Sequence, residues 1–309
     1  EAIALARKAN RQVMVGIGQC LLGEALTEKG DLTEAADTFR AYLDNFSELS
    51  RSDPKWRREV AVAHSKIAHI EQEEGKLDEA LKSMHSCSDL IRDLLKGDPR
   101  NHDLERELAA IHNRVAILLT DMKKPDGALD NYRMAEEIYR RLTGIDPSNS
   151  NWQEGLARTL RNAGSLQGRQ GKYAEALVAL EESLGIFSSQ ADSDPRNTAL
   201  QSEVAWTKYW IGVIYRGQRL FEKALAAQRE NQCIYERLIA DDPENINFRG
   251  ELAVAHMSVA TVLMYLGNKE EAQTEFLKAR RELERVIKEA PTIVRWKKTL
   301  AEVNAWIAR

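Results

Sequence analysis

The sequence predicts an all-α fold, a right-handed α-solenoid of antiparallel helix hairpins. Two markers that repeat in phase support this prediction, because self-similarity at a fixed period of this size is typical of a solenoid or an array. A proline recurs after 45 residues once and then every 48 residues, and an alanine 19 residues before it recurs with it. The prolines are Pro54, Pro99, Pro147, Pro195, Pro243 and Pro291, and the alanines are Ala35, Ala80, Ala128, Ala176, Ala224 and Ala272.

The first helix of each copy follows the proline and keeps its apolar side chains on one face. In the fourth copy, Leu156 follows Trp152 by four residues, and Ala163 follows seven residues later. Such spacings place side chains on the same side of an α-helix. The next position is always small, so a second helix can approach closely. The residues at this position are Gly23, Ala68, Ala116, Gly164, Gly212, Ala260 and Ala308.

A turn and a second helix complete each copy. Four turns contain glycine, which adopts the left-handed backbone that closes a helix, whereas Lys123 and Arg219 replace it in the third and fifth copies. The second helix carries the recurring alanine and ends at the proline, because proline disfavours helix at the residue before it. The turn glycines are Gly30, Gly75, Gly171 and Gly267.

This order of residues resembles the tetratricopeptide repeat family. A hairpin of that family has a small residue, an alanine, a large apolar residue and an exit proline, as in Gly164, Ala176, Leu180 and Pro195. The period of 48 residues exceeds the usual value of about 34, so the chain looks like a long-period bacterial variant. The resemblance covers residues 11–309 and implies an interaction scaffold without activity of its own, in the recognition or regulatory part of a larger protein.

We expect one solenoid domain over residues 1–309. The repeat boundaries follow from the two markers, and a lone helix closes the chain with Trp306 on its exposed side. The predicted repeats are at about 7–53, 54–98, 99–146, 147–194, 195–242 and 243–290, with a terminal helix at 291–309.

Composition argues against several classes of partner. The 309 residues include 44 Lys and Arg against 48 Asp and Glu, so the basic excess of a nucleic-acid-binding protein is absent. No apolar run approaches the roughly 18–20 residues of a membrane span. The widely spaced Cys20, Cys87 and Cys233 argue against a disulfide framework and indicate a reducing compartment, the cytoplasm.

No arrangement of residues in the sequence predicts catalysis, a cofactor or a metal. Zinc-protease, nucleophile-elbow and paired-cysteine motifs are absent. The glycine-containing segment from Gly164 to Lys172 lacks the pattern of a phosphate-binding loop. His64, His112 and His256 share one position of three first helices. We expect packed, hydrogen-bonded histidines rather than metal ligands, and a protein that is not an enzyme.

The candidate binding surface is the inner face of the first helices, which binds peptides in the resembled family. In copies four to six, one helical stripe of this face carries arginine, aromatic and methionine side chains, residue types enriched at binding interfaces. We predict that this stripe, here named the arginine–aromatic patch, binds an acidic segment with an apolar side chain, from a partner or from the parent protein. Its residues are Arg158, Arg161, Trp206, Tyr209, Arg216, Met257 and Met264.

Other interpretations of the patch stay open. Trp206 and Tyr209 could pack between neighbouring first helices while the arginines are solvated. The chain could be a regulator whose superhelix changes pitch when a peptide binds, or a nucleic-acid binder that uses Arg158, Arg161 and Arg169, which the negative total charge opposes. If the patch binds a partner, we expect charge reversal of Arg158 and Arg161 to weaken binding with little loss of thermal stability.

A chaperone-tail clamp, found in some members of the resembled family, is not supported. The clamp needs lysine and asparagine at matching inner positions across three repeats. The residues where its key asparagine would stand are Glu24, His69, Ile117, Ser165, Val213 and Thr261.

Overall fold

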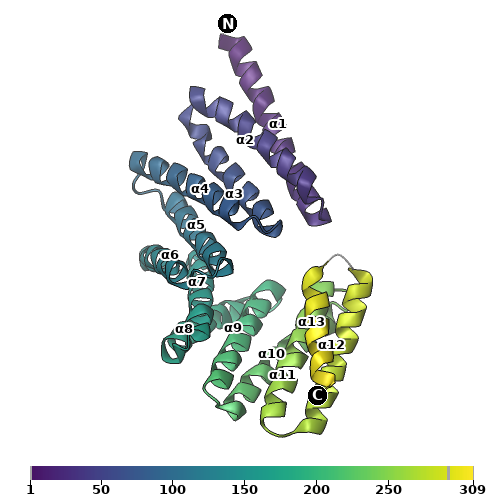
Figure 1. The fold of residues 1–309 in the computed structure, drawn as a ribbon. Helices are drawn as coiled ribbons and strands as arrows, with labels where there is room; N and C mark the ends of the chain where they lie inside the picture. The colour runs from purple at the N-terminus through teal and green to yellow at the C-terminus, as the bar shows by residue number, and fades with distance from the viewer. Residues whose placement is uncertain (1, 291–292, 309) are drawn as a thin grey trace. The chain divides into compact units, whose positions relative to one another are not determined.

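The structure, a computed structural model, describes residues 2–290 and 293–308, with residues 2–9 and 294 described by their backbone alone. Within this part of the chain there are thirteen α-helices, one short 3-10 helix and no strand (Figure 1). The predicted all-α class of successive helix hairpins is therefore confirmed. The chain divides into two compact units, residues 1–155 (unit 1) and 156–309 (unit 2), within the seventh helix.

Unit 1 consists of three hairpins and the start of a fourth. Within it, α2 also packs against α3, and α4 packs against α5, so successive hairpins are joined. A 3-10 helix, η1 (Pro54–Trp56), links the first two hairpins. The hairpins pair α1 (Ala2–Lys29) with α2 (Leu32–Ser52), α3 (Arg57–Glu73) with α4 (Leu77–Gly97), and α5 (His102–Asp121) with α6 (Pro125–Ile145).

Unit 2 continues the same pattern and ends in a single helix. Its last helix packs against both helices of the preceding hairpin. The helices are α7 (Ser150–Arg169, from residue 156), α8 (Tyr173–Ser193), α9 (Thr198–Gly217), α10 (Phe221–Asp241), α11 (Ile246–Tyr265), α12 (Lys269–Glu289) and α13 (Val294–Ile307).

Close packing within the hairpins explains the recurring small residues. A Cβ atom added to Gly23 would lie 2.7 Å from the Phe39 ring, and one added to Gly212 would collide with the side chain of Gln228. The second helix therefore approaches the first at a point where no larger side chain fits. The recurring alanines of all six second helices are fully buried: Ala35, Ala80, Ala128, Ala176, Ala224 and Ala272.

The turns inside the hairpins share one left-handed residue. Glycine occupies this position in four hairpins, with φ of +78° at Gly171, for example. Lys123 and Arg219 adopt the same conformation with φ of 57° and 63°. The turn geometry is therefore kept even where the sequence departs from glycine.

The junctions between hairpins end one helix and cap the next. Each aspartate of an Asp-Pro pair is the residue that follows a second helix, as predicted. At four of the five Asp-Pro junctions, an asparagine three residues after the aspartate then accepts a backbone hydrogen bond at the start of the following first helix. Asn101 accepts from Leu104 at 3.1 Å, Asn149 from Trp152 at 3.2 Å, Asn197 from Leu200 at 3.2 Å and Asn245 from Phe248 at 3.1 Å.

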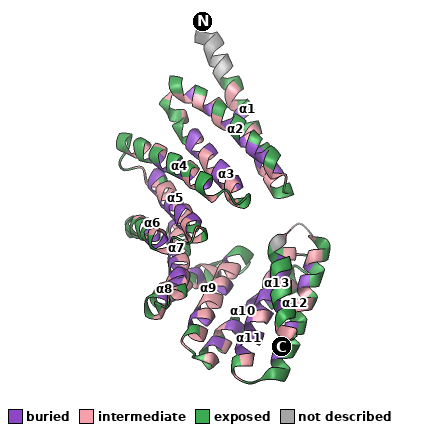
Figure 2. Ribbon diagram, viewed as in Figure 1, coloured by how far each residue is buried: buried purple, intermediate pink, exposed green. Residues whose placement is uncertain are grey.

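The C-terminal helix closes the apolar core of unit 2. Trp296 and Val303 of α13 are buried against α11 and α12, and α11 is itself buried over most of its length (Figure 2). The prediction that Trp306 is exposed is wrong, because its ring stacks on Phe276 at 5.7 Å. Trp306 lies only about 80° from the buried face at 100° per residue, so its large ring reaches the core.

Among the residues that the structure describes, no helix is both long and apolar enough to cross a lipid bilayer.

Candidate functional site

The predicted arginine–aromatic patch lies entirely in unit 2. Its residues come from three successive first helices, as the repeat phase predicts. Arg158 and Arg161 lie on α7, Trp206, Tyr209 and Arg216 on α9, and Met257 and Met264 on α11.

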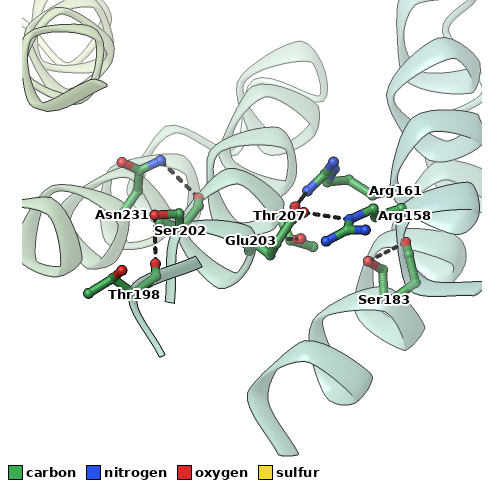
Figure 3. A network of polar contacts seen from close by, with 10 residues as sticks. Arg158, Arg161, Ser183, Thr198, Ser202, Glu203, Thr207 and Asn231 are labelled. Atoms are coloured by element: carbon green, nitrogen blue, oxygen red, sulfur yellow. Dashed lines mark hydrogen bonds and ion pairs between the residues drawn. The ribbon is translucent and has the colours of Figure 1, made fainter. Parts of the chain in front are cut away.

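Both arginines of α7 bind a single carboxylate of α9. Arg158 Nε donates to Glu203 Oε1 at 2.7 Å, and Arg161 Nη1 forms an ion pair with Glu203 Oε2 (Figure 3). Arg161 also lies 5.9 Å from the centre of the Phe187 ring. The arginines are therefore neither simply solvated nor available as a free pair, because an internal carboxylate already holds them.

The protonation of Glu203 follows from its surroundings. Its side chain is only 17% exposed, and burial alone would raise the pKa of this carboxyl. The charge of Arg161 and the hydrogen bonds from Arg158 and Arg161 outweigh burial and lower the pKa. Glu203 is therefore ionised at neutral pH, and the three side chains together carry one net positive charge.

The sequence contains a signal for this contact outside the predicted stripe. A glutamate recurs at one position of four first helices, nine residues before the small residue. Each of these glutamates binds a group elsewhere in the protein. Glu59 accepts from Tyr42, Glu107 from Arg58, Glu203 from Arg158 and Arg161, and Glu251 from Arg295.

Three aromatic rings of α9 form a continuous cluster. Trp206 and Tyr209 meet edge to face at 5.4 Å, and Tyr209 meets Trp210 in the same way at 5.2 Å. Arg295, held by Glu251 at 2.8 Å, lies 5.5 Å from the centre of the Trp206 ring. All three rings are partly exposed. Neighbouring side chains therefore pack against the cluster but leave part of each ring accessible to solvent.

The remaining patch residues lie in two different places, the core of the C-terminal helices and a pocket at the end of α9. Met257 and Met264 are partly buried and, like Tyr209, pack against the core cluster of α11, α12 and α13. Burial raises the pKa of the Tyr209 hydroxyl. Arg216 lies at the other end of α9 and lines a pocket beside Trp210. The structure therefore gathers Tyr209, Met257 and Met264 at one core, which Trp206 adjoins through its contact with Tyr209, but it places Arg216 at the other end of α9.

The histidines act as packed polar groups. His112 Nδ1 lies 2.9 Å from Asn131 Oδ1, and His256 Nδ1 lies 2.6 Å from Glu275 Oε2, so the expected hydrogen-bonded role is confirmed for both. Burial lowers the pKa of His64. In the described part of the chain, no group of three or more His, Cys, Asp or Glu side chains could hold a metal ion.

Sequence comparison identifies the repeat in two segments of the chain. A profile of the tetratricopeptide repeat matches residues 107–189, and a second profile of the same repeat matches residues 2–50. Residues 2–50 and 107–189 therefore carry tetratricopeptide repeats. A comparison with curated proteins finds no match.

Solved structures with little sequence identity share this tetratricopeptide repeat fold. BtubC (BKLC) from P. vanneervenii is 17% identical with a TM-score of 0.65, over 84% of this chain and 92% of that one. Apo RapI is 15% identical with a TM-score of 0.58, over 87% and 99%. The S. pombe nuclear import adaptor Nro1 is 10% identical with a TM-score of 0.57, over 95% and 99%. Tetratricopeptide repeat proteins in general bind protein or peptide partners.

Proposed function

We propose that the chain is a non-catalytic interaction scaffold that binds a peptide or a partner domain on the concave face of its first helices. The aromatic cluster of α9 carries this proposal: Trp206 and Tyr209 are half-buried rings in edge-to-face contact, with an arginine over Trp206. Rigid aromatic rings offer apolar contact area at a low cost in conformational entropy, and such anchors dominate binding energy at interfaces.

The chemistry of the patch favours an acidic segment with an apolar side chain. The apolar side chain would lie against Trp206, Met257 and Met264, where methionine adapts its shape to the partner. A carboxylate of the partner would approach Arg158, whose side chain is 47% exposed, beside the pair that Arg161 forms with Glu203. The single net positive charge of Arg158, Arg161 and Glu203 together favours binding of an anion but still allows a neutral partner to bind.

The setting of this scaffold is part of the same proposal. We place it as the recognition or regulatory part of a larger bacterial protein in the cytoplasm, with its repeats over residues 1–309 acting as one scaffold. Cys20, Cys87 and Cys233 are free thiols, which supports a reducing compartment. Three arginines on a chain with net charge −4 are too few for a nucleic-acid-binding surface.

The ion pairs of Glu203 change how the patch must be tested. Charge reversal of Arg158 and Arg161 would place three carboxylates together at a site where Glu203 is mostly buried. Such a variant loses thermal stability, contrary to the expectation from the sequence. Substitutions of the aromatic residues therefore give the clearer test.

The test starts from peptides selected by the wild-type protein from a random display library. Affinity is then measured by fluorescence anisotropy. We expect Trp206→Ala/Tyr209→Ala to weaken binding at least about tenfold, because interface aromatics are hot spots. The matched control is Val178→Ala/Leu277→Ala, which removes exposed apolar side chains from second helices of the same unit and leaves binding unchanged.

The melting temperature of Trp206→Ala alone shows whether weaker binding comes from the lost aromatic contact or from a destabilised fold. Equal affinity of the aromatic variants, or no selected peptide, would refute the proposal.

A further inference from the structure

A pocket lies at the hairpin turns of unit 2, away from the arginine–aromatic patch except at Arg216. Its volume is about 390 Å³, which is within the range of ligand sites. It is built where α7, α9 and α11 end and where α8 and α10 begin. Its large lining residues are Arg169, Arg216, Arg219, Tyr173, Trp210, Phe221 and Tyr265.

The pocket is strongly basic. Three arginines line it and no aspartate or glutamate does. Within the described residues, none of the three forms an ion pair, in contrast to Arg158 and Arg161. The hairpins of unit 1 carry Glu28, Glu73 and Asp121 at the positions equivalent to Arg169. The positive charge therefore belongs to this pocket and is not a requirement of the repeat.

Aromatic rings give the pocket flat apolar walls. Phe221 and Tyr265 stack in parallel, with ring centres 5.2 Å apart and an interplanar angle of 2°. Tyr265 is nevertheless 56% exposed. Arg169 lies 5.0 Å from the centre of the Trp210 ring. Exposed aromatic faces beside unpaired guanidinium groups suit a ligand that is both anionic and aromatic.

Arg219 occupies a position where the fold itself favours glycine. The equivalent residues of the neighbouring hairpins, Gly171 and Gly267, have the same left-handed backbone. A side chain with a Cβ atom is sterically strained in this conformation. The chain thus keeps a guanidinium at the pocket rim at a cost in stability, which supports a role in binding.

We propose that this turn-side pocket binds an acidic protein segment that carries an aromatic side chain, with two or three carboxylates on the arginines and the ring against Tyr265 and Phe221. Three arginines could neutralise at most three phosphates, fewer than the roughly six to ten contacts of a typical nucleic-acid complex, so a protein segment fits better. The inference rests on the proposed function in that the partner is a protein, but the pocket shares only Arg216 with the arginine–aromatic patch.

The chain offers a matched pair of variants for the test. Arg219→Gly removes a pocket cation and leaves the turn with its preferred residue, so a loss of binding cannot be assigned to misfolding. Lys123→Gly makes the equivalent change in unit 1, where Lys123 has φ of 57°. The probe is a fluorescein-labelled octapeptide of glutamate, aspartate and phenylalanine. A second peptide replaces each acid by its amide.

We expect the acidic probe to bind the wild type and Lys123→Gly equally, and to bind Arg219→Gly about fivefold more weakly, as for a partly exposed ion pair. Arg216→Gln/Arg219→Gly should weaken binding further, and added salt should weaken wild-type binding. The inference is overturned if the acidic probe fails to bind, if Arg219→Gly or the amide peptide binds as tightly, or if a single-stranded oligonucleotide displaces the probe at lower concentration than unlabelled peptide does.

The two proposals fail separately in this assay. Binding of the acidic probe that survives Trp206→Ala/Tyr209→Ala but falls with Arg219→Gly supports the pocket. Binding that is lost in the aromatic variant and unchanged in Arg219→Gly overturns the pocket inference and leaves the proposed function standing.

Discussion

Lys123 and Arg219 hold a backbone conformation that the other hairpins give to glycine. The surrounding backbone imposes it, because Lys123 N–H donates to the carbonyl of Thr120 at 3.0 Å, as Gly75 N–H does to that of Gln72 at 2.9 Å. In both turns the hydrogen bond spans three residues at the end of the first helix. The steric cost of the side chain is therefore local and can be removed by one substitution.

Lys123→Gly should stabilise the protein by about 0.5–1 kcal/mol, because relief of the left-handed strain exceeds the added flexibility of the unfolded chain. Urea unfolding followed by circular dichroism measures the change. Gly75→Ala is the reverse control and should cost about 1 kcal/mol. A lower urea midpoint for Lys123→Gly would contradict this account of the turn.

Glu275 makes the stability of unit 2 depend on pH. Burial alone would raise its pKa, but hydrogen bonds from His256 and Lys278 and their charges lower it to about 2, from an ordinary value of 4.5. A carboxyl with a lowered folded-state pKa stabilises the fold in its ionised form. This contribution is complete above pH 4.5 and is lost as the pH falls towards 2.

Comparison of Glu275→Gln with the wild type isolates this contribution. The variant should be less stable than the wild type at pH 6, and the difference should shrink steadily between about pH 4.5 and 2. Only the wild type has a carboxyl at this position, and its unfolded state binds a proton there before the folded state does. Urea midpoints at each pH provide the measurement. A difference that stays constant over this range would show that the ionisation of Glu275 does not stabilise the fold.

At the scale of the helices, sequence reasoning succeeds because the signals are local. The helix faces follow from spacings of four and seven residues, and the ends follow from the Asp-Pro pairs, which the structure confirms. The partner of the patch arginines cannot be predicted in this way, because Glu203 lies 45 residues from Arg158 in the sequence. Only the stacking of α9 on α7 brings them together, and a stripe counted along single helices does not include it.

The asparagine caps are expected to stabilise the first helices. Asn101 accepts a hydrogen bond from Leu104 N–H at 3.1 Å. Asn101→Ala should cost about 1 kcal/mol because it removes this cap, whereas Asn101→Asp should keep most of the stability. Thermal and urea unfolding of both variants test the prediction. Equal losses in the two variants would mean that the side-chain oxygen is not the stabilising group.

At the scale of the whole molecule, stability arises from contacts between neighbouring elements. Within each unit, helices pack mainly against their neighbours along the chain, and contacts that skip one helix, such as α13 with α11 and α9 with α7, link successive hairpins. Stability of this kind is close to a sum of repeat and neighbour terms. The expected single domain over residues 1–309 stays a prediction, because the chain divides into two compact units.

Substitution of a core residue should therefore act locally. Ile91 of α4 is 1% exposed, and Ile91→Val should cost about 0.5–1.5 kcal/mol. Amide hydrogen exchange should accelerate in α3, α4 and α5 and stay unchanged in α11 and α12. Uniform acceleration over both units would instead show that the chain opens as one cooperative body.

The cysteines provide a built-in reporter of such opening. Burial raises the pKa of the Cys87 thiol to about 12, so thiol-specific reagents find almost no thiolate there while α4 stays packed. Cys233 is exposed and reacts without any opening of the chain. The rate of Cys87 alkylation, compared with that of Cys233 in the same sample, therefore measures how often the second hairpin opens locally.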